Sequence, residues 1–238
     1  MHRILPNYAI RMWMKTADGG LAAVLYGPCT VSTTIDNVRV EIEEKTSYPF
    51  NQTVEMIIRP EVAKSFSLYF RDPEWSRATK VECGGAHIER EGDFWKISKQ
   101  WQRGDRILLN FVAEVEQVNA VNGDVALRYG PLLYALPIPH KRSVVKTYSV
   151  SGFEDTFYEP LDGPPEELAL ASSSRWQSFG FAPVANLQDS ATLRPFDEAI
   201  IGLRGEMVNI ATGAKTPIQL VPLGNAPVLR RLTFPLTP

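Results

Sequence analysis

Thiols and imidazoles are the side chains of this sequence best suited to nucleophilic or metal chemistry. The two cysteines, Cys29 and Cys83, have a spacing that matches no zinc or redox motif. Each lies in a strand-like stretch, which favours buried free thiols over a disulfide. The three histidines, His2, His87 and His140, are widely separated, and none has the spacing of metal ligands. We therefore predict no metal site built from this chain alone and assign no catalytic residue.

Paired carboxylates are a second candidate, because glycosidases use two of them. Glu154 and Asp155 with Glu159, or Asp72 with Glu74, would supply such a pair. The sequence does not give the separation of the carboxyl groups, on which this chemistry depends. Acidic residues are common in solvated loops, and that interpretation is favoured for both groups.

Aromatic side chains are the better candidates for binding. Tyr69, Trp75, Phe94, Trp95 and Trp101 cluster in the first half of the chain, and sugars bind by stacking their apolar faces on such rings. A sandwich of about 100 residues also needs aromatic side chains for its core. Core packing is the favoured interpretation, and a sugar platform made of Trp75, Trp95 and Trp101 is the alternative.

These candidates must be positioned by strands, because the main hydrophobic pattern has period two. Val38, Val40 and Ile42 alternate with charged residues, as in a half-buried strand. Turn signals such as Asp18-Gly-Gly and Gly104-Asp separate the apolar stretches. Many short strands without intervening helices predict an all-β fold of two antiparallel β-sandwich domains. The other predicted strands in the first half are 54–58, 66–70, 94–97 and 106–111.

A second domain is predicted to begin near residues 122–124 (Asn-Gly-Asp), because a new set of strands follows this turn. The stretch from His140 to Ala185 is irregular and long for a loop in a compact domain, which predicts an interface loop or a mobile lid. The strands predicted in this half are 125–127, 132–136, 198–208, 218–221 and 229–234.

Residues 1–14 differ from the rest, because Ile4, Leu5, Tyr8 and Met12 recur at helical spacing. A lone helix of this length is marginal in water and needs a packing partner. No second helix of similar quality follows, so we expect its partner to lie upstream of Met1.

Composition limits the partners of the chain. The 238 residues are 44% hydrophobic with a net charge of -2 and a pI near 6.0. The basic residues are scattered, which gives no case for nucleic acid or an anionic membrane. No apolar run approaches the roughly 20 residues of a membrane span. The start lacks a signal-peptide pattern, and the cellular compartment stays unassigned.

Several blocks in order along the chain resemble one family. The chain is similar to the C-terminal part of the β-L-arabinofuranosidase-like proteins of glycoside hydrolase family 127 (GH127) and its relatives. The resemblance spans nearly the whole chain, and it rests on the order and spacing of the blocks. The blocks are 19–28 (GGLAAVLYGP), 48–50 (YPF), 70–75 (FRDPEW), 101–105 (WQRGD), 128–136 (RYGPLLYAL) and 220–224 (LVPLG).

The resemblance implies an N-terminal (α/α)6 barrel that carries the chemistry, followed by two β-sandwiches. Such relatives use a zinc-bound cysteine nucleophile and a glutamate general acid in a retaining double displacement. The cysteine belongs to a Cys-Cys-x-x-Asn type motif, and Met1-His2 matches the pair that often follows it. None of the catalytic residues maps onto this sequence, and neither Cys29 nor Cys83 is assigned as the nucleophile.

The resulting expectation is an accessory fragment. Residues 1–16 would be the last helix of a missing barrel, 17–120 the first β-sandwich and 121–238 the second. Full-length relatives would release L-arabinofuranose, or a similar sugar, from plant-derived glycans with zinc as cofactor. This chain would hold no cofactor and would be inactive, with the missing barrel as its packing partner. The alternative is a free-standing carbohydrate-binding module, which requires the three tryptophans on one exposed face.

Overall fold

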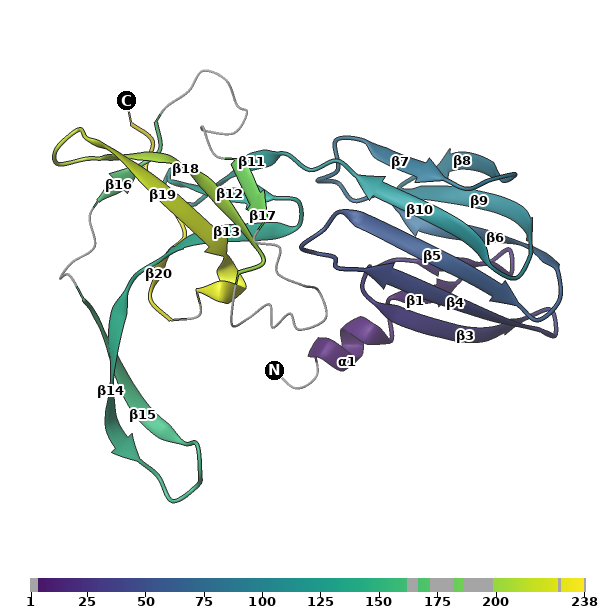
Figure 1. Cartoon of the computed structure of the whole chain (residues 1–238), viewed down its shortest axis with the longest axis horizontal. Helices are drawn as coiled ribbons and strands as arrows, with labels where there is room; N and C mark the ends of the chain where they lie inside the picture. Colours follow the sequence, from purple (N-terminus) through teal and green to yellow (C-terminus); the bar gives the residue numbers. More distant parts are fainter. Residues whose placement is uncertain (1–3, 162–166, 172–181, 186–198, 227, 238) are drawn as a thin grey trace. The chain divides into compact units, whose positions relative to one another are not determined.

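The chain folds into two compact units, Met1–Ala113 and Glu114–Pro238. The computed structural model describes residues 4–161, 167–171, 182–185, 199–226 and 228–237 (Figure 1). The sequence predicted the boundary after residue 120, whereas the structure places it between Ala113 and Glu114. Strand β11 (Val115–Asn119) pairs with β12 (Val125–Tyr129), and this pairing assigns residues 115–119 to the second unit.

Unit 1 is built from two five-stranded sheets, as expected for a sandwich. One sheet has the order β1-β2-β6-β9-β8, with β1 (Trp13–Lys15), β2 (Leu21–Ala23), β6 (Lys64–Arg71), β9 (Phe94–Trp101) and β8 (His87–Glu91). The other has the order β3-β4-β5-β10-β7, with β3 (Cys29–Ile35), β4 (Val38–Thr46), β5 (Thr53–Pro60), β10 (Asp105–Phe111) and β7 (Thr79–Glu82). Strands β2 and β6 pair in parallel, and the other paired strands of this unit are antiparallel.

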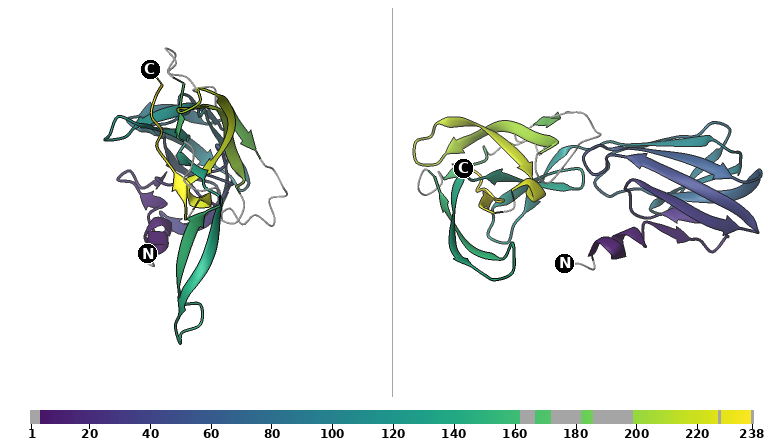
Figure 2. Two further views of the ribbon diagram at one scale, coloured as in Figure 1. Left: turned by 90° about the vertical axis from the view of Figure 1, so that its left-hand side faces the viewer. Right: turned by 60° about the horizontal axis from the view of Figure 1, so that its bottom comes forward.

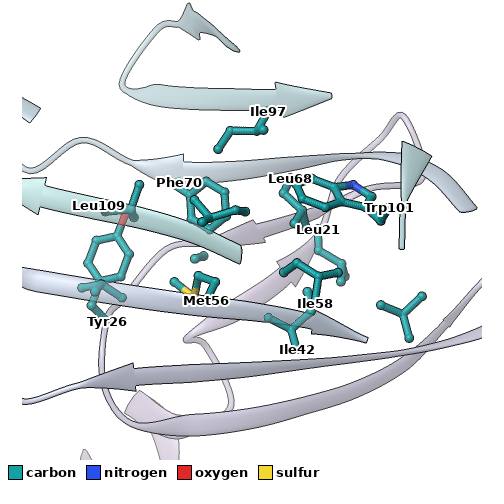
Figure 3. Packing of buried hydrophobic residues seen from close by; sticks show 14 of the residues in the cluster. Leu21, Tyr26, Ile42, Met56, Ile58, Leu68, Phe70, Ile97, Trp101 and Leu109 are labelled. Atoms are coloured by element: carbon teal, nitrogen blue, oxygen red, sulfur yellow. The ribbon is translucent and has the colours of Figure 1, made fainter. Parts of the chain in front are cut away.

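The period-two pattern predicted for the first half is confirmed. Alternate side chains of these strands point into one hydrophobic core. Val40 and Ile42 are buried, and Leu68 and Phe70 are fully buried on β6. Tyr69 points the other way, and its hydroxyl donates to Asp18 Oδ2 at 2.8 Å. Figure 3 shows these strands contributing apolar side chains to a single cluster. Burial of this apolar surface is the main stabilising contribution to unit 1.

The parallel β2–β6 pair depends on a glycine. A Cβ added to Gly20 would lie 2.2 Å from the backbone oxygen of Ser67, so a larger residue must push the strands apart. We expect Gly20→Ala to lower the free energy of unfolding by about 1–3 kcal/mol, measured by denaturant titration. Gly84→Ala is the matched control, because its added Cβ meets no atom within 4 Å. Equal losses in the two variants would contradict this account.

Unit 2 contains a sheet of eight strands and a separate two-stranded hairpin. The sheet follows the order β11-β12-β13-β19-β18-β16, and β17 and β20 pair with β18 and β13. Its other strands are β13 (Leu132–Pro137), β16 (Leu168–Ala169), β17 (Ala182–Ala185), β18 (Ile201–Asn209), β19 (Lys215–Pro222) and β20 (Arg230–Arg231), with a short 3-10 turn, η2, at Leu223–Asn225. Both units are therefore built almost entirely of strands within the described residues, as predicted for an all-β fold.

The hairpin corrects one sequence prediction. Strands β14 (His140–Thr147) and β15 (Glu154–Pro160) form antiparallel pairs within the stretch predicted to be irregular. Their side chains are mostly exposed, so the alternation of apolar and polar residues that marks a half-buried strand is missing there. Figure 2 shows the hairpin extending away from the sheet of unit 2. Much of the rest of the predicted loop, from 162 to 181, lies outside the described residues.

The N-terminal helix is shorter than predicted. Helix α1 spans Ile4–Ala9, and Trp13 and Met14 belong to β1, whereas the sequence predicted a helix over 1–14. Met12 accepts hydrogen bonds from the backbone of Val24 and Leu25, which draws the chain after α1 into the sheet. Residues Met1 and His2 lie outside the described part of the chain. No helix in the described ranges has the length and apolar character of a membrane span.

Candidate functional site

The structure buries two of the three tryptophans of the predicted sugar platform. Trp101 is fully buried, and its Nε1 donates to the backbone oxygen of Phe66 at 2.9 Å. Trp75 is 9% exposed, and its ring packs against those of Tyr48 and Phe111 at centroid distances of 6.4 and 5.6 Å. Neither ring can present a face to a sugar. A platform of three exposed rings is therefore wrong, and the core interpretation holds for these two residues.

Trp95 is different, because it is half-buried and lines a pocket within unit 1. The pocket, called the Trp95 pocket below, has a volume of about 390 Å³. It lies beside the segment that joins β6 to β7 and the turn between β8 and β9. Its other lining residues are Asp72, Pro73, Glu74, Ser76, Arg77, Ala78, Thr79, Arg90 and Asp93.

An ion pair organises one wall of the Trp95 pocket. Arg90 Nη2 lies 3.0 Å from Asp72 Oδ2, and the Asp72 side chain is only 11% exposed. The hydroxyl of Thr79 donates to the other oxygen, Asp72 Oδ1. The backbone N–H of Asp72 donates to the oxygen of Asp93 at 2.7 Å, which joins the two segments that line the pocket. These contacts hold the polar groups in fixed positions.

The indole of Trp95 contributes an unusual donor. Its Nε1 is buried and has no hydrogen-bond partner among the described residues. A buried donor without an acceptor costs about 1–3 kcal/mol, so such groups call for an explanation. The guanidinium of Arg90 lies 5.8 Å from the ring centroid, and this cation–π contact occupies one ring face.

The carboxylate pairs of the sequence analysis lie in two different places. Asp72 and Glu74 both line the Trp95 pocket. Glu154 and Asp155 lie on the hairpin, where Glu154 accepts from Arg142 and Asp155 accepts from the hydroxyl of Tyr148. The hairpin carboxylates are thus engaged at the surface.

The two thiols are free and poorly suited to nucleophilic attack. Burial, together with the nearby Glu44 carboxyl, raises the pKa of Cys29 to about 11, and burial raises the pKa of Cys83. Because both pKa values are raised, both thiols are protonated at neutral pH. The reactive form of a cysteine is the thiolate. The Cys29 thiol donates a hydrogen bond to Glu44 Oε2, with the two atoms 3.6 Å apart. One thiol and one carboxylate are too few ligands for a zinc site. Within the described residues, no group of three or more potential ligands is placed to hold a metal.

Glu44 is the one buried charged residue in the described core, and sequence analysis missed it. It accepts hydrogen bonds from Trp13 Nε1 at 3.0 Å and from the backbone N–H of Gly27 at 2.9 Å. Burial raises the pKa of this carboxyl to about 7. The signal was present, because Glu44 continues the inward-facing series of Val40 and Ile42 on β4. The Glu44 carboxyl thus connects β4 to Trp13 on β1 and to the segment at Gly27.

The first unit is similar to one known protein family. Residues 20–112 match the family model described as beta-L-arabinofuranosidase, GH127 middle domain. The resemblance to GH127-like proteins is confirmed. The matched residues contain both sheets of the sandwich except β1, together with the whole Trp95 pocket. No match was found among curated proteins.

Solved structures extend the likeness to the fold of almost the whole chain. A GH127 beta-L-arabinofuranosidase from Geobacillus stearothermophilus T6 is 21% identical with a TM-score of 0.71, covering 99% of this chain and 36% of its own. A second structure, a GH127 beta-arabinofuranosidase, is 15% identical with a TM-score of 0.65, covering 93% and 36%. A third, described as a glycoside hydrolase, is 17% identical with a TM-score of 0.64, covering 94% and 37%. The chain thus spans little more than a third of the length of each of these structures.

Proposed function

We propose that this chain is the accessory β-sandwich portion of a β-L-arabinofuranosidase-like glycoside hydrolase and is inactive on its own. The observation that carries the proposal is the match of residues 20–112 to the GH127 middle domain. The fold match covers 99% of this chain but only 36% of the Geobacillus enzyme, which supports the proposal that the chain corresponds to one portion of a larger protein. In the whole protein, hydrolysis would fall to a separate catalytic portion that uses the zinc and cysteine chemistry implied by the resemblance.

The state of the two thiols supports the absence of activity. The high pKa of Cys29, near 11, leaves almost no thiolate at neutral pH. A retaining mechanism through cysteine needs that thiolate at the anomeric carbon. On this proposal the chain contributes no nucleophile and serves to stabilise and position a separate catalytic portion.

Helix α1 is the proposed contact with that partner. None of its six residues is buried, and Ile4 and Leu5 are 65% and 79% exposed. Tyr8 tethers it to the sandwich through a hydrogen bond from its hydroxyl to the oxygen of Tyr26, at 2.7 Å. Exposed apolar side chains on so short a helix gain stability only from a further packing partner.

Amide hydrogen exchange of the full chain tests this assignment. We expect the amides of Ala9 and Ile10 to exchange with little protection, while those of β5 and β6 exchange slowly because their hydrogen bonds lie in the core. Leu5→Glu should change the free energy of unfolding by less than about 0.5 kcal/mol, since that side chain has no burial to lose. Leu68→Ala is the contrasting variant. Protection of α1 equal to that of the strands would contradict the proposal.

A further inference from the structure

We propose that the Trp95 pocket binds a neutral, hydroxyl-rich ligand the size of one or two sugar units. Its volume of about 390 Å³ falls within the range of roughly 300–1,000 Å³ that is typical of small-molecule sites. The class of ligand is inferred from the residues that line the pocket. The choice of an arabinose sugar as the probe rests on the proposed function. The site lies in unit 1 and needs no residue from any other unit.

The charges around the pocket favour a neutral ligand. Three carboxylates, those of Asp72, Glu74 and Asp93, line it together with the guanidinium groups of Arg77 and Arg90. An anion would be repelled by the carboxylates, and a cation would be repelled by the guanidinium groups. Sugar hydroxyls can donate to the carboxylates and accept from arginine at the same time. A small site that contains both positive and negative side chains is therefore suited to a neutral polyol.

The polar wall is preorganised for such contacts. Asp72 is held by Arg90 and by the hydroxyl of Thr79, and Ser76 Oγ lies 3.0 Å from Thr79 Oγ1. Groups that are already fixed lose little conformational entropy when a ligand binds. The array thus presents acceptors and donors without rearrangement of the backbone.

Trp95 supplies the second, independent observation. Its buried Nε1–H lacks an acceptor in the described part of the chain, so a ligand oxygen can accept from it without breaking an existing hydrogen bond once a lining side chain moves aside and uncovers it. Because Arg90 covers one face of the ring, recognition uses the edge of the indole rather than stacking on its face. This mode differs from the three-ring platform that the sequence suggested.

The test is a titration of the full, ¹⁵N-labelled chain with arabinobiose, followed through the indole N–H resonances. We expect the Trp95 resonance, assigned by its loss in Trp95→Phe, to shift with a dissociation constant in the millimolar range. Arg90→Gln should weaken binding by about tenfold, because it removes a charged donor and frees Asp72. Arg106→Gln is the control, since it breaks a comparable surface pair with Glu55 on the other sheet and should leave binding unchanged.

Three outcomes would overturn the proposal. They are a Trp95 resonance that does not move, an affinity that Arg90→Gln leaves unaltered, and a stronger response to sulfate than to arabinobiose. The proposed function would survive each of them, because it is judged by exchange of α1 and by hydrolysis. Conversely, a protected α1 with normal arabinobiose binding would overturn the accessory role and leave the pocket assignment intact.

Discussion

Trp101→Ala is expected to lower the free energy of unfolding of unit 1 by about 3–5 kcal/mol, the range for loss of a large aromatic side chain from a core. The ring is fully buried and packs against Phe66 at a centroid distance of 5.9 Å. Its removal leaves a cavity and also strands the oxygen of Phe66 without its indole donor. Urea denaturation of the full chain, followed by tryptophan fluorescence, measures the loss.

Two phenylalanine variants sharpen this prediction. Trp101→Phe keeps a ring but breaks the bond to Phe66, so we expect a loss of about 1–3 kcal/mol. Trp95→Phe breaks no hydrogen bond within the described residues and should cost less than about 1 kcal/mol. Equal losses in the two variants would show that burial and hydrogen bonding do not distinguish these tryptophans.

Stability is expected to fall as the pH rises from about 4.5 to about 7, through the ionisation of Glu44. The pKa of this carboxyl is raised by burial from 4.5 to about 7 in the folded chain. Between these values the folded state holds a proton that the unfolded state has released, so increasing pH favours unfolding. The contribution is fully present below pH 4.5, and on the order of 3 kcal/mol is lost by neutral pH.

Glu44→Gln isolates this effect, because an amide does not titrate in that range. The variant should lack the Glu44 contribution to the pH dependence. At pH 5 it should be less stable by about 1–3 kcal/mol, since its NH₂ group faces a donor, Trp13 Nε1 or the N–H of Gly27. Glu43→Gln changes the adjacent, outward-facing carboxyl and should keep the wild-type decline. An unchanged pH profile in Glu44→Gln would contradict the assignment.

Periodicity predicted the sandwich strands well because they are half-buried. The alternation at 38–42 became β4, and the patterns at 54–58, 66–70, 94–97 and 106–111 became β5, β6, β9 and β10. The same rule could have placed Trp95 and Trp101 correctly, since both share the inward parity of Ile97 on β9. A platform needs outward-facing rings, and the period-two pattern already argued against one.

Other features depend on contacts that a one-dimensional pattern cannot show. Trp75 lies between β6 and β7, so no periodicity reports that its ring packs on Tyr48 and Phe111. The Trp95 pocket brings residues 72–79 beside residues 90–95, which requires the pairing of β6 with β9. The helical spacing at the N-terminus predicted α1 but not its end, because strand pairing with β2 competes for Trp13 and Met14.

Hydrolysis of 4-nitrophenyl β-L-arabinofuranoside by the purified full chain, with zinc added, tests the accessory role most directly. We expect no release of nitrophenol above the buffer blank, because burial raises the pKa of both thiols and keeps them protonated at neutral pH. Cys29→Ala and Cys83→Ala should therefore behave like the parent chain. Turnover by the parent chain that either substitution abolishes would contradict the account and assign catalysis to the sandwich itself.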